Sequence, residues 1–379
     1  MTISIQQAPE LIPEMRQYLE LMAKHNATDL HFKSFSPPIF RIGGLPRRVD
    51  GPALPPEEVE KLVRSMMTVD QAGRFDNTGT VDFAVGIHGT GRYRVNVFRQ
   101  RGSVSAAIRR VRFDVPTIED LNLPRSIKTL ADFQMGVCFC AGITGSGKST
   151  TLAAVIDLIN HSRRCHILTL EDPIEYLYRD DKSFVNQREI GVDVDSFHTA
   201  LKYMVREDPD VILVGEMRDS ETVETALISA ETGHLVFGTV HSGSAPQTIG
   251  RVLDFFPSHR HDQIRQLLYF TLRAVMVQQL LKGAKKEFPM VPAMELMLVN
   301  PAVRKLIREG DDEKIADVIR SCKEEGMQDM NTSLVDLVKR GLITEETAME
   351  ASPNPESLAM NLKGIYLGSD LGTIIGSSK

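Results

Sequence analysis

The chain has 379 residues, of which 42% are hydrophobic and 25% charged, and a formal net charge of −6. This length allows two or three domains, each with its own core, and the acidic balance argues against a nucleic-acid groove. The four cysteines form no C-x-x-C pair, as expected in a reducing compartment. With no signal peptide recognised and no segment expected to insert into a membrane, we expect a cytoplasmic protein.

Residues 1–110 are predicted to form a small α+β domain with an antiparallel sheet. Apolar residues at helical spacing run from Leu11 to Met22, and short strand-like segments follow, punctuated by Gly and Pro. These segments are residues 29–33, 39–42, 81–85, 93–99 and 103–110. Residues 111–124, with prolines at positions 116 and 124, are predicted to form a linker.

Residues 125–300 alternate apolar strand-like segments with longer helical patterns, which is typical of an α/β domain with a parallel sheet. The long apolar run of residues 267–281 is interrupted by Arg273, and we interpret it as a buried helix. Residues 301–367 are predicted to be helical. The Gly- and Ser-rich residues 368–379 are predicted to form a disordered tail.

The most informative motif is GITGSGKS at residues 142–149, which fills every position of the phosphate-binding pattern G-x-x-x-x-G-K-[ST]. It stands between a short apolar strand and a helical pattern, as the pattern requires. Backbone N–H groups of such a loop bind phosphate at a helix N-terminus, the lysine reaches the β- and γ-phosphates, and the hydroxyl binds Mg²⁺. The predicted nucleotide-binding residues are Gly142, Thr144, Gly145, Ser146, Gly147, Lys148, Ser149 and Thr150.

Glu216 is the candidate for activating water. It ends a buried strand, and the C-terminal ends of parallel strands meet at one crevice, so it should face the phosphate loop. Gly215 replaces the aspartate that usually precedes such a glutamate. Mg²⁺ would therefore be bound by Ser149, the phosphates and water, with Glu216 as the acid near the metal. Glu216 would position or deprotonate the attacking water. The alternative is that Glu216 only caps the helix beginning near Asp219.

Two other strand ends carry candidate groups. Residues 171–175 include three acids, which are costly side by side unless a metal or cations compensate them; a solvated loop is the alternative. His241 follows the strand of residues 235–240. It could sense the γ-phosphate or couple it to a neighbouring element, although a lone histidine has structural roles equally often.

Candidate cations for the transferring phosphoryl group lie in the N-terminal domain. Residues 91–101 alternate like a strand, so Arg92 and Arg94 share a face, and Arg109 stands at the end of the next strand. Arginine suits bidentate phosphate contact and completion of a site from a neighbouring subunit. Solvated charges on an edge strand are the alternative interpretation.

In their order along the chain these motifs resemble those of the PilT/PilU-type retraction ATPases of the type IV pilus, within the secretion-ATPase superfamily. The resemblance covers roughly residues 10–350. It rests on residues 27–31, 37–38, 41–44, 94–98, 142–150, 171–175, 185–189, 208–216 and 232–241.

The resemblance implies a PAS-like N-terminal domain, a RecA-like ATPase domain with a helical C-terminal extension, and a homohexameric ring. It also implies hydrolysis of ATP with Mg²⁺ to drive pilus retraction, at an inner-membrane platform protein of the pilus machine. By position, Glu216 matches the catalytic glutamate, Glu175 the acid of the family's Asp box, and His241 the histidine of its His box.

Arg94 and Arg109 match the family's arginine-finger positions best, with Arg92 close behind, and their order stays open. The chain departs from the family at residues 242–243, which are Ser-Gly where Thr-Asn is frequent. Residues 302–307 match in part a C-terminal motif that the family ties to retraction, which favours a PilT role over a PilU role.

Three other functions are considered. A pilus-assembly or type II secretion ATPase would usually have a longer N-terminal region and a tetracysteine zinc motif, which these four cysteines cannot form. A RecA-like nucleic-acid motor is disfavoured by the acidic balance and the lack of a basic stripe interleaved with aromatic residues. A nucleotide-binding regulator without turnover is disfavoured by the acids and candidate arginine fingers together.

Overall fold

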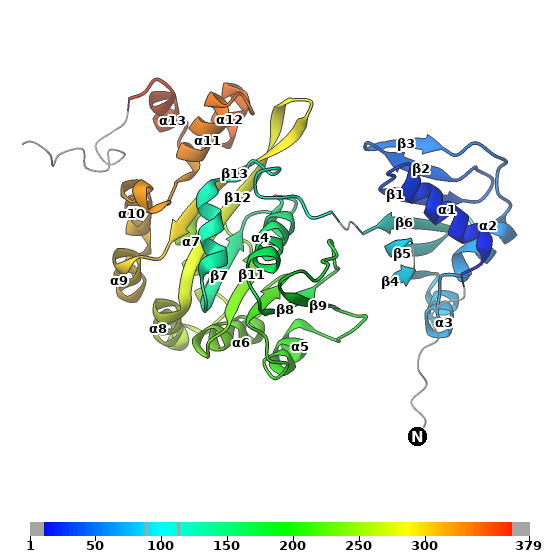
Figure 1. Ribbon diagram of the computed structural model, residues 1–379, viewed down its shortest axis with the longest axis horizontal. Helices are drawn as coiled ribbons and strands as arrows, with labels where there is room; N and C mark the ends of the chain where they lie inside the picture. Colours follow the sequence, from blue (N-terminus) through cyan, green and yellow to red (C-terminus); the bar gives the residue numbers. More distant parts are fainter. Residues whose placement is uncertain (1–10, 88–89, 112–113, 366–379) are drawn as a thin grey trace, which may run out of the picture. The chain divides into compact units, whose positions relative to one another are not determined.

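The structure is a computed structural model, described here for residues 11–87, 90–111 and 114–365 (Figure 1). The chain divides into two compact units, residues 1–113 and 114–379. The predicted disordered tail, residues 368–379, lies outside the described residues. Among the described residues, no helix combines the length and the apolar character needed to span a membrane.

The first unit is an antiparallel sheet covered by helices, as the sequence predicts. Its six strands are ordered β3-β2-β1-β6-β5-β4. They are β1 (Asp29–Lys33), β2 (Ile39–Ile42), β3 (Leu45–Arg48), β4 (Thr80–Ile87), β5 (Gly91–Gln100) and β6 (Ser103–Arg110), and the helices are α1 (Pro13–Lys24), α2 (Pro56–Arg64) and α3 (Val69–Thr78). On β5, Tyr93, Val95 and Val97 are fully buried, so the intervening residues 92, 94 and 96 lie on the opposite face of the sheet.

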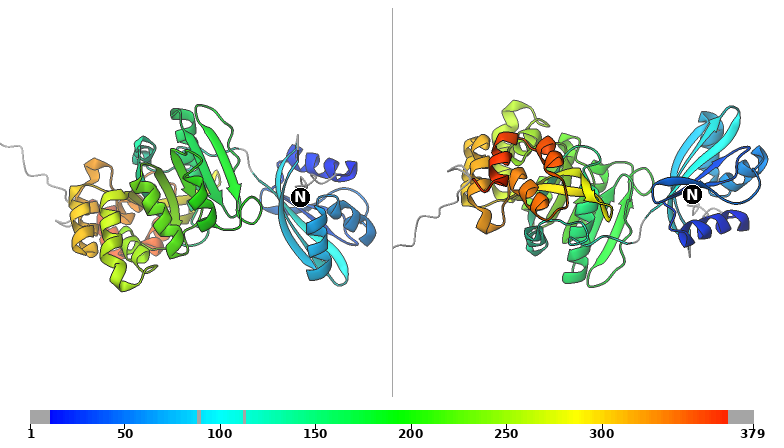
Figure 2. Two further views of the ribbon diagram at one scale, coloured as in Figure 1. Left: turned by 90° about the horizontal axis from the view of Figure 1, so that it is seen from below. Right: turned by 90° about the horizontal axis from the view of Figure 1, so that it is seen from above.

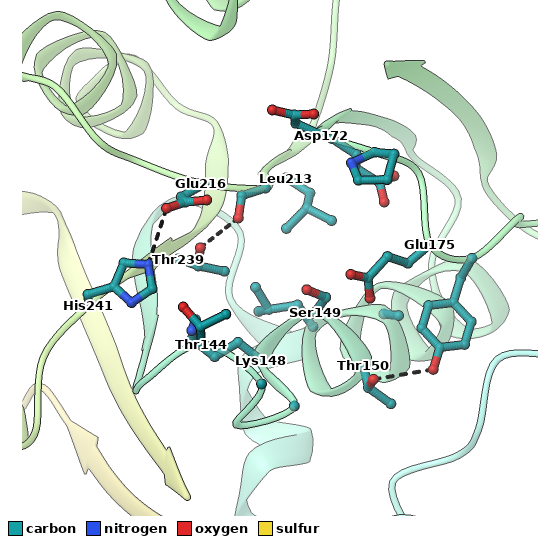
Figure 3. Close-up of a pocket in the computed structure, with 18 of the residues that line it drawn as sticks. Thr144, Lys148, Ser149, Thr150, Asp172, Glu175, Leu213, Glu216, Thr239 and His241 are labelled. Atoms are coloured by element: carbon teal, nitrogen blue, oxygen red, sulfur yellow. Dashed lines mark hydrogen bonds and ion pairs between the residues drawn. The ribbon is translucent and has the colours of Figure 1, made fainter. Parts of the chain in front are cut away.

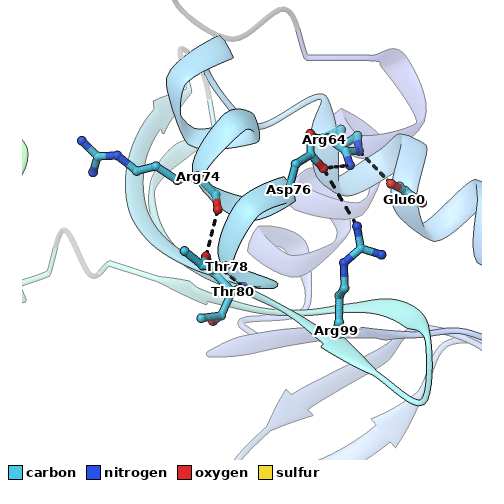
Figure 4. A network of polar contacts seen from close by, with 7 residues as sticks. All are labelled: Glu60, Arg64, Arg74, Asp76, Thr78, Thr80 and Arg99. Atoms are coloured by element: carbon cyan, nitrogen blue, oxygen red, sulfur yellow. Dashed lines mark hydrogen bonds and ion pairs between the residues drawn. The ribbon is translucent and has the colours of Figure 1, made fainter.

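A polar network attaches α3 to α2 and β5 (Figure 4). The Phe75 ring is fully buried, and the guanidinium groups of Arg64 and Arg99 lie 5.6 and 5.1 Å from its centroid. Asp76 accepts from Arg64 at 2.5 Å and lies 4.0 Å from Arg99, while Arg64 also donates to Glu60 at 2.8 Å. Burial of the aromatic ring supplies most of the stabilisation here, because exposed ion pairs contribute little.

The second unit is built on a seven-stranded sheet of order β13-β12-β7-β11-β10-β8-β9. Its strands are β7 (Gly136–Ala141), β8 (His166–Glu171), β9 (Phe184–Glu189), β10 (Val211–Val214), β11 (Leu235–Val240), β12 (Leu272–Lys285) and β13 (Phe288–Leu298). The covering helices include α4 (Lys148–Ser162), α5 (Phe197–Met204), α6 (Ser220–Glu231), α7 (Ala245–Leu253) and α8 (His261–Thr271). Every residue of β7, β8, β10 and β11 is buried, which is typical of a parallel sheet covered on both faces. The predicted α/β class is confirmed.

The prediction of one buried helix over residues 267–281 is wrong. Helix α8 ends at Thr271 and strand β12 begins at Leu272. Strand β12 pairs in parallel with β7 and antiparallel with β13. An apolar run that is buried on both faces has no helical or strand periodicity to distinguish the two, so only the pairing partners decide its conformation.

Most of residues 111–124, which the sequence predicts to be a linker, belongs to the second unit, because this unit begins at residue 114. Ile118 and Leu123 are 4% and 6% exposed and join the core beneath α4. Thr117 and Asp120 close a local turn, in which the Thr117 hydroxyl donates to the Asp120 carboxylate at 2.7 Å. Burial of Ile118 and Leu123 therefore packs this segment against the second unit, although its prolines are typical of a linker. A 3₁₀ helix (Arg125–Asp132) follows.

The C-terminal region is helical over the residues that the structure describes. Its helices are α9 (Pro301–Glu309), α10 (Ile315–Ser321), α11 (Met330–Lys339), α12 (Glu345–Ala351) and α13 (Pro355–Leu362). Helices α11 to α13 pack against the β12–β13 hairpin around Val291 and Ala293, as the right-hand view of Figure 2 shows. Helix α9 packs instead in the large core of the α/β sheet through Val303 and Ile307.

Candidate functional site

The phosphate loop connects β7 to α4, as predicted. Gly142, Gly145 and Gly147 have φ of +143°, +79° and +87°, a backbone that residues with a side chain rarely adopt. Gly147 is the N-cap of α4, and no described side chain caps this helix start. Its first N–H groups therefore remain available for an anion, and the helix dipole favours one.

A pocket of about 520 Å³ opens above this loop (Figure 3). Of the predicted nucleotide-binding residues, Thr144, Gly145, Gly147, Lys148, Ser149 and Thr150 line it. Gly142 and Ser146 do not, and Ser146 is only 2% exposed. Lys148 donates to the main-chain carbonyls of Gly142 at 2.9 Å and Ile143 at 3.0 Å. Its partial burial lowers its pKa.

Glu216 and His241 line the same pocket from neighbouring strand ends. His241 Nε2 lies 3.1 Å from Glu216 Oε1. Helix α6, which follows Glu216, is capped by Asp219, whose carboxylate accepts from the Thr222 N–H at 2.8 Å. The capping role considered for Glu216 is therefore filled by another residue, and the Glu216 carboxylate lines the pocket instead.

The absence of an aspartate at position 215 has a steric reason. A Cβ on Gly215 would stand 2.9 Å from the Leu170 carbonyl oxygen and 3.3 Å from the Glu171 Cα. The Gly215 N–H donates to that same carbonyl at 2.7 Å, and its own carbonyl accepts from the Thr239 hydroxyl at 2.6 Å. Strands β8 and β10 approach so closely here that only glycine fits.

The three acids of residues 171–175 differ in their burial and hydrogen bonding. Glu171 is 8% exposed, accepts from Thr169 at 2.7 Å and from Gln187 at 3.0 Å, and its burial raises its pKa. All three acids, Glu171, Asp172 and Glu175, line the pocket, and Glu175 points toward Ser149 across it (Figure 3).

The three candidate arginines lie in the first unit and differ in their contacts. Arg109 donates to Asp29 at 2.8 Å. Arg94, which pairs in register with Arg109 across β5 and β6, is exposed, and it forms no ion pair with any residue that the structure describes. Arg92 is partly buried beside the fully buried Tyr93. Arg94 is thus the candidate whose guanidinium remains available.

Sequence reasoning missed Arg218, which also lines the pocket. Arg218 donates to Glu216 Oε2 at 2.5 Å and, with His241, holds the pKa of Glu216 below its usual value. The pocket of the second unit therefore contains an arginine in addition to Lys148. The only sequence signal was its position two residues after Glu216, next to the helix cap Asp219.

The segment after His241 is held by Glu295 of β13. The Ala245 N–H, at the start of α7, donates to Glu295 Oε1 at 2.6 Å. Ser244 caps the same helix, and the hydroxyls of Ser242 and Thr248 lie 2.6 Å apart. Burial raises the pKa of Glu295 to about 7, so this carboxyl holds its proton far more tightly than in an unfolded chain.

We expect Glu295→Gln to remove a pH dependence of stability. Because the folded pKa is raised from 4.5 to about 7, the wild type loses stability as pH rises through this range, by roughly 1–3 kcal/mol. The glutamine keeps the acceptor for Ala245 but carries no charge. Urea unfolding of both proteins from pH 4 to 8 tests this, and curves that stay parallel throughout would contradict it.

Comparison with known proteins places the chain in a family. Residues 118–350 match the family of type II/IV secretion system proteins. The chain is 41% identical to the type IV pilus retractation ATPase PilT of Pseudomonas aeruginosa, over 91% of this chain and 99% of the relative. It is 36% identical to the type IV pilus ATPase PilU of the same organism, over 94% of this chain and 92% of the relative.

Among solved structures, the crystal structure of the pilus retraction motor PilT with bound ADP matches with a TM-score of 0.82 and 46% identity, covering 90% of this chain and 97% of that one. The chain therefore belongs to the type II/IV secretion system protein family, as a PilT/PilU-type ATPase.

Proposed function

We propose that this protein is a motor ATPase that couples ATP hydrolysis to type IV pilus retraction, and hence to twitching motility. The observation that carries the proposal is one pocket that joins an uncapped phosphate loop to the Glu216–His241 pair. The similarity to PilT over nearly the whole of both chains supports retraction as the output.

In this proposal each pocket residue has a defined task. The N–H groups of the phosphate loop and Lys148 bind the phosphates, and Glu216 accepts the proton of the attacking water. His241, in contact with Glu216, orients that carboxylate and responds to the γ-phosphate. Glu175, the acid of the Asp box, faces Ser149 and supplies a second carboxylate near the bound metal and phosphates.

The residues present fit Mg²⁺ as the metal. No group of three His, Cys, Asp or Glu side chains that could hold a metal occurs within the described residues. The Ser149 hydroxyl, with the carboxylates of Glu175 and Glu216 across the pocket, instead suits an ion bound mainly by phosphate oxygens and water, the mode that Mg²⁺ prefers. When bound, the ion neutralises charge on the phosphate oxygens.

We further propose a homohexamer in which an arginine of the N-terminal unit completes the site, with Arg94 as the first candidate and Arg109 and Arg92 as the others. The ring would work in the cytoplasm against an inner-membrane platform protein of the pilus machine. For the domains we propose the predicted division, with the linker shortened at its C-terminal end because Ile118 and Leu123 are buried.

The phenotype of a gene deletion tests the retraction role. A retraction motor predicts cells with excess pili that do not retract, whereas an assembly ATPase predicts cells without pili. An ATPase rate that increases with added DNA would favour the nucleic-acid motor, and a purified protein that binds ATP without turnover would favour the regulator.

The role of α9 is tested on its exposed face, because Val303 and Ile307 are fully buried and removing the whole helix would open the core. Lys305 and Arg308 are exposed. We expect Lys305→Ala combined with Arg308→Ala to keep the ATPase rate within about twofold, since surface substitutions barely affect stability, and to abolish twitching. Val303→Asp is the matched control and should lose both activities. A parallel loss of ATPase and twitching in the surface variant would make α9 structural.

A further inference from the structure

Gln278 of β12 joins the phosphate loop to the neighbouring strand. Its side chain is 1% exposed. Nε2 donates to the main-chain carbonyl of Ser146 at 2.7 Å, and Oε1 accepts from the Thr151 hydroxyl at 2.7 Å. A carbonyl can only accept, so these two partners determine the orientation of the amide. One buried side chain thus holds the last part of the phosphate loop and the first turn of α4.

The glycines of the loop are adapted to this strand. A Cβ on Gly147 would stand 2.7 Å from Gln278 Nε2, and a Cβ on Gly142 would stand 2.4 Å from the main-chain oxygen of Gln278. A Cβ on Gly145, by contrast, would meet nothing within 4 Å. Gly145 is therefore required by its backbone conformation alone, whereas Gly142 and Gly147 are also required by the close approach of β12.

The same rung of the hairpin reaches the C-terminal helices. Gln278 pairs in register with Met294 of β13. The Met294 N–H donates to the Ser333 hydroxyl of α11 at 3.0 Å, and its carbonyl accepts from Gln328 at 2.8 Å. On the adjacent rung, Glu295 holds the start of α7. The phosphate loop, the segment after His241 and α11 are thus attached to neighbouring rungs of one hairpin.

We propose that Gln278 is a positioning residue for the nucleotide reaction, which keeps the phosphate loop in its phosphate-binding shape and ties that shape to the β12–β13 hairpin. The inference rests on the proposed ATPase function. Gln278 is not among the described residues that line the nucleotide pocket. It therefore acts through Ser146 and Thr151. Without it, a buried carbonyl and a buried hydroxyl lose their partners, and binding must order a loosened loop.

The test uses the full chain and the variant Gln278→Met, which keeps the length of the side chain and removes both hydrogen bonds. We expect the dissociation constants for ADP and ATP to rise roughly tenfold to a hundredfold, because each unpaired buried group carries a large penalty. We expect the rise in KM to exceed the fall in kcat. Gln279→Met is the matched control, because the next residue of a strand points to the opposite face; it should bind like the wild type.

A double-mutant cycle separates positioning from a general loss of stability. If Gln278 acts through Thr151, then Thr151→Val should weaken binding less in the Gln278→Met background than in the wild type. Gln278→Glu, which keeps the acceptor for Thr151 and removes the donor to Ser146, is the second variant if Gln278→Met fails to fold, and it should also weaken binding.

The inference would be overturned if a folded Gln278 variant bound nucleotide with wild-type affinity, or if its effect were fully additive with that of Thr151→Val. The proposed function would still stand in that case, provided that the wild type hydrolyses ATP. A wild-type protein that neither binds nor hydrolyses ATP would instead refute the proposed function.

Discussion

Glu216→Gln is expected to lower kcat by roughly 10²–10⁴-fold while leaving nucleotide affinity nearly unchanged, because an amide cannot accept the proton of the attacking water. Arg218 and His241 hold the pKa of Glu216 below its usual value, so the wild-type carboxylate is fully ionised at neutral pH. The turnover of the wild type should therefore fall only at a pH below the usual pKa of a glutamate, where the Glu216 carboxylate becomes protonated. Single-turnover ATP hydrolysis and ADP binding by the purified protein measure the two effects separately.

Lys148→Ala is the contrasting variant for this experiment. It removes the cation nearest the β- and γ-phosphates and should lose affinity as well as turnover. Glu175→Gln tests separately the other carboxylate to which we assign a role in the pocket. Near wild-type hydrolysis by Glu216→Gln would show that the base is another group, and Glu175, which points toward Ser149, would then be the next candidate.

Arg94→Ala and Glu216→Gln should each be inactive alone and should recover part of the activity when mixed. An arginine supplied in trans is worth roughly 10³–10⁵ in turnover, and a ring of mixed subunits contains some interfaces in which both groups are intact. Arg94 is the residue to change first because its guanidinium is exposed without an ion pair among the described residues, whereas Arg109 is bound to Asp29. The measurement is ATPase activity against mixing ratio.

Arg109→Ala supplies the matched comparison, since it lies opposite Arg94 in register on the next strand. Specific activity of the wild type should also rise with protein concentration until a ring forms. If mixtures remain inactive although labelled subunits are shown to exchange, Arg94 is not a finger in trans. Arg218, inside the pocket of the ATPase unit, would then be the cation to test in the same subunit.

The sequence by itself determined the parts of this protein whose physics is local. The phosphate loop needs closely spaced glycines, a lysine and a hydroxyl between a strand and a helix, so one short segment predicts it. The strand ends at Glu216 and His241 follow from apolar runs, because parallel strands present their C-terminal ends at one edge. Alternation along β5 likewise predicted that Arg92 and Arg94 share one face of the sheet.

Tertiary structure alone decided what depends on partners distant in sequence. The run of residues 267–281 suits a buried helix or a buried strand equally, and only pairing with β7 and β13 made most of it β12. Gln278 is an unremarkable polar residue in that run until the fold places it against Ser146 and Thr151. Burial raises the pKa of Glu295, although the Ala245 N–H, 50 residues away in sequence, donates to it and favours its charged form. Gln278 and Ser146, for example, are 132 residues apart in the sequence. Burial and hydrogen bonds between such distant residues arise only when the sheet assembles, so they leave no pattern in the local sequence.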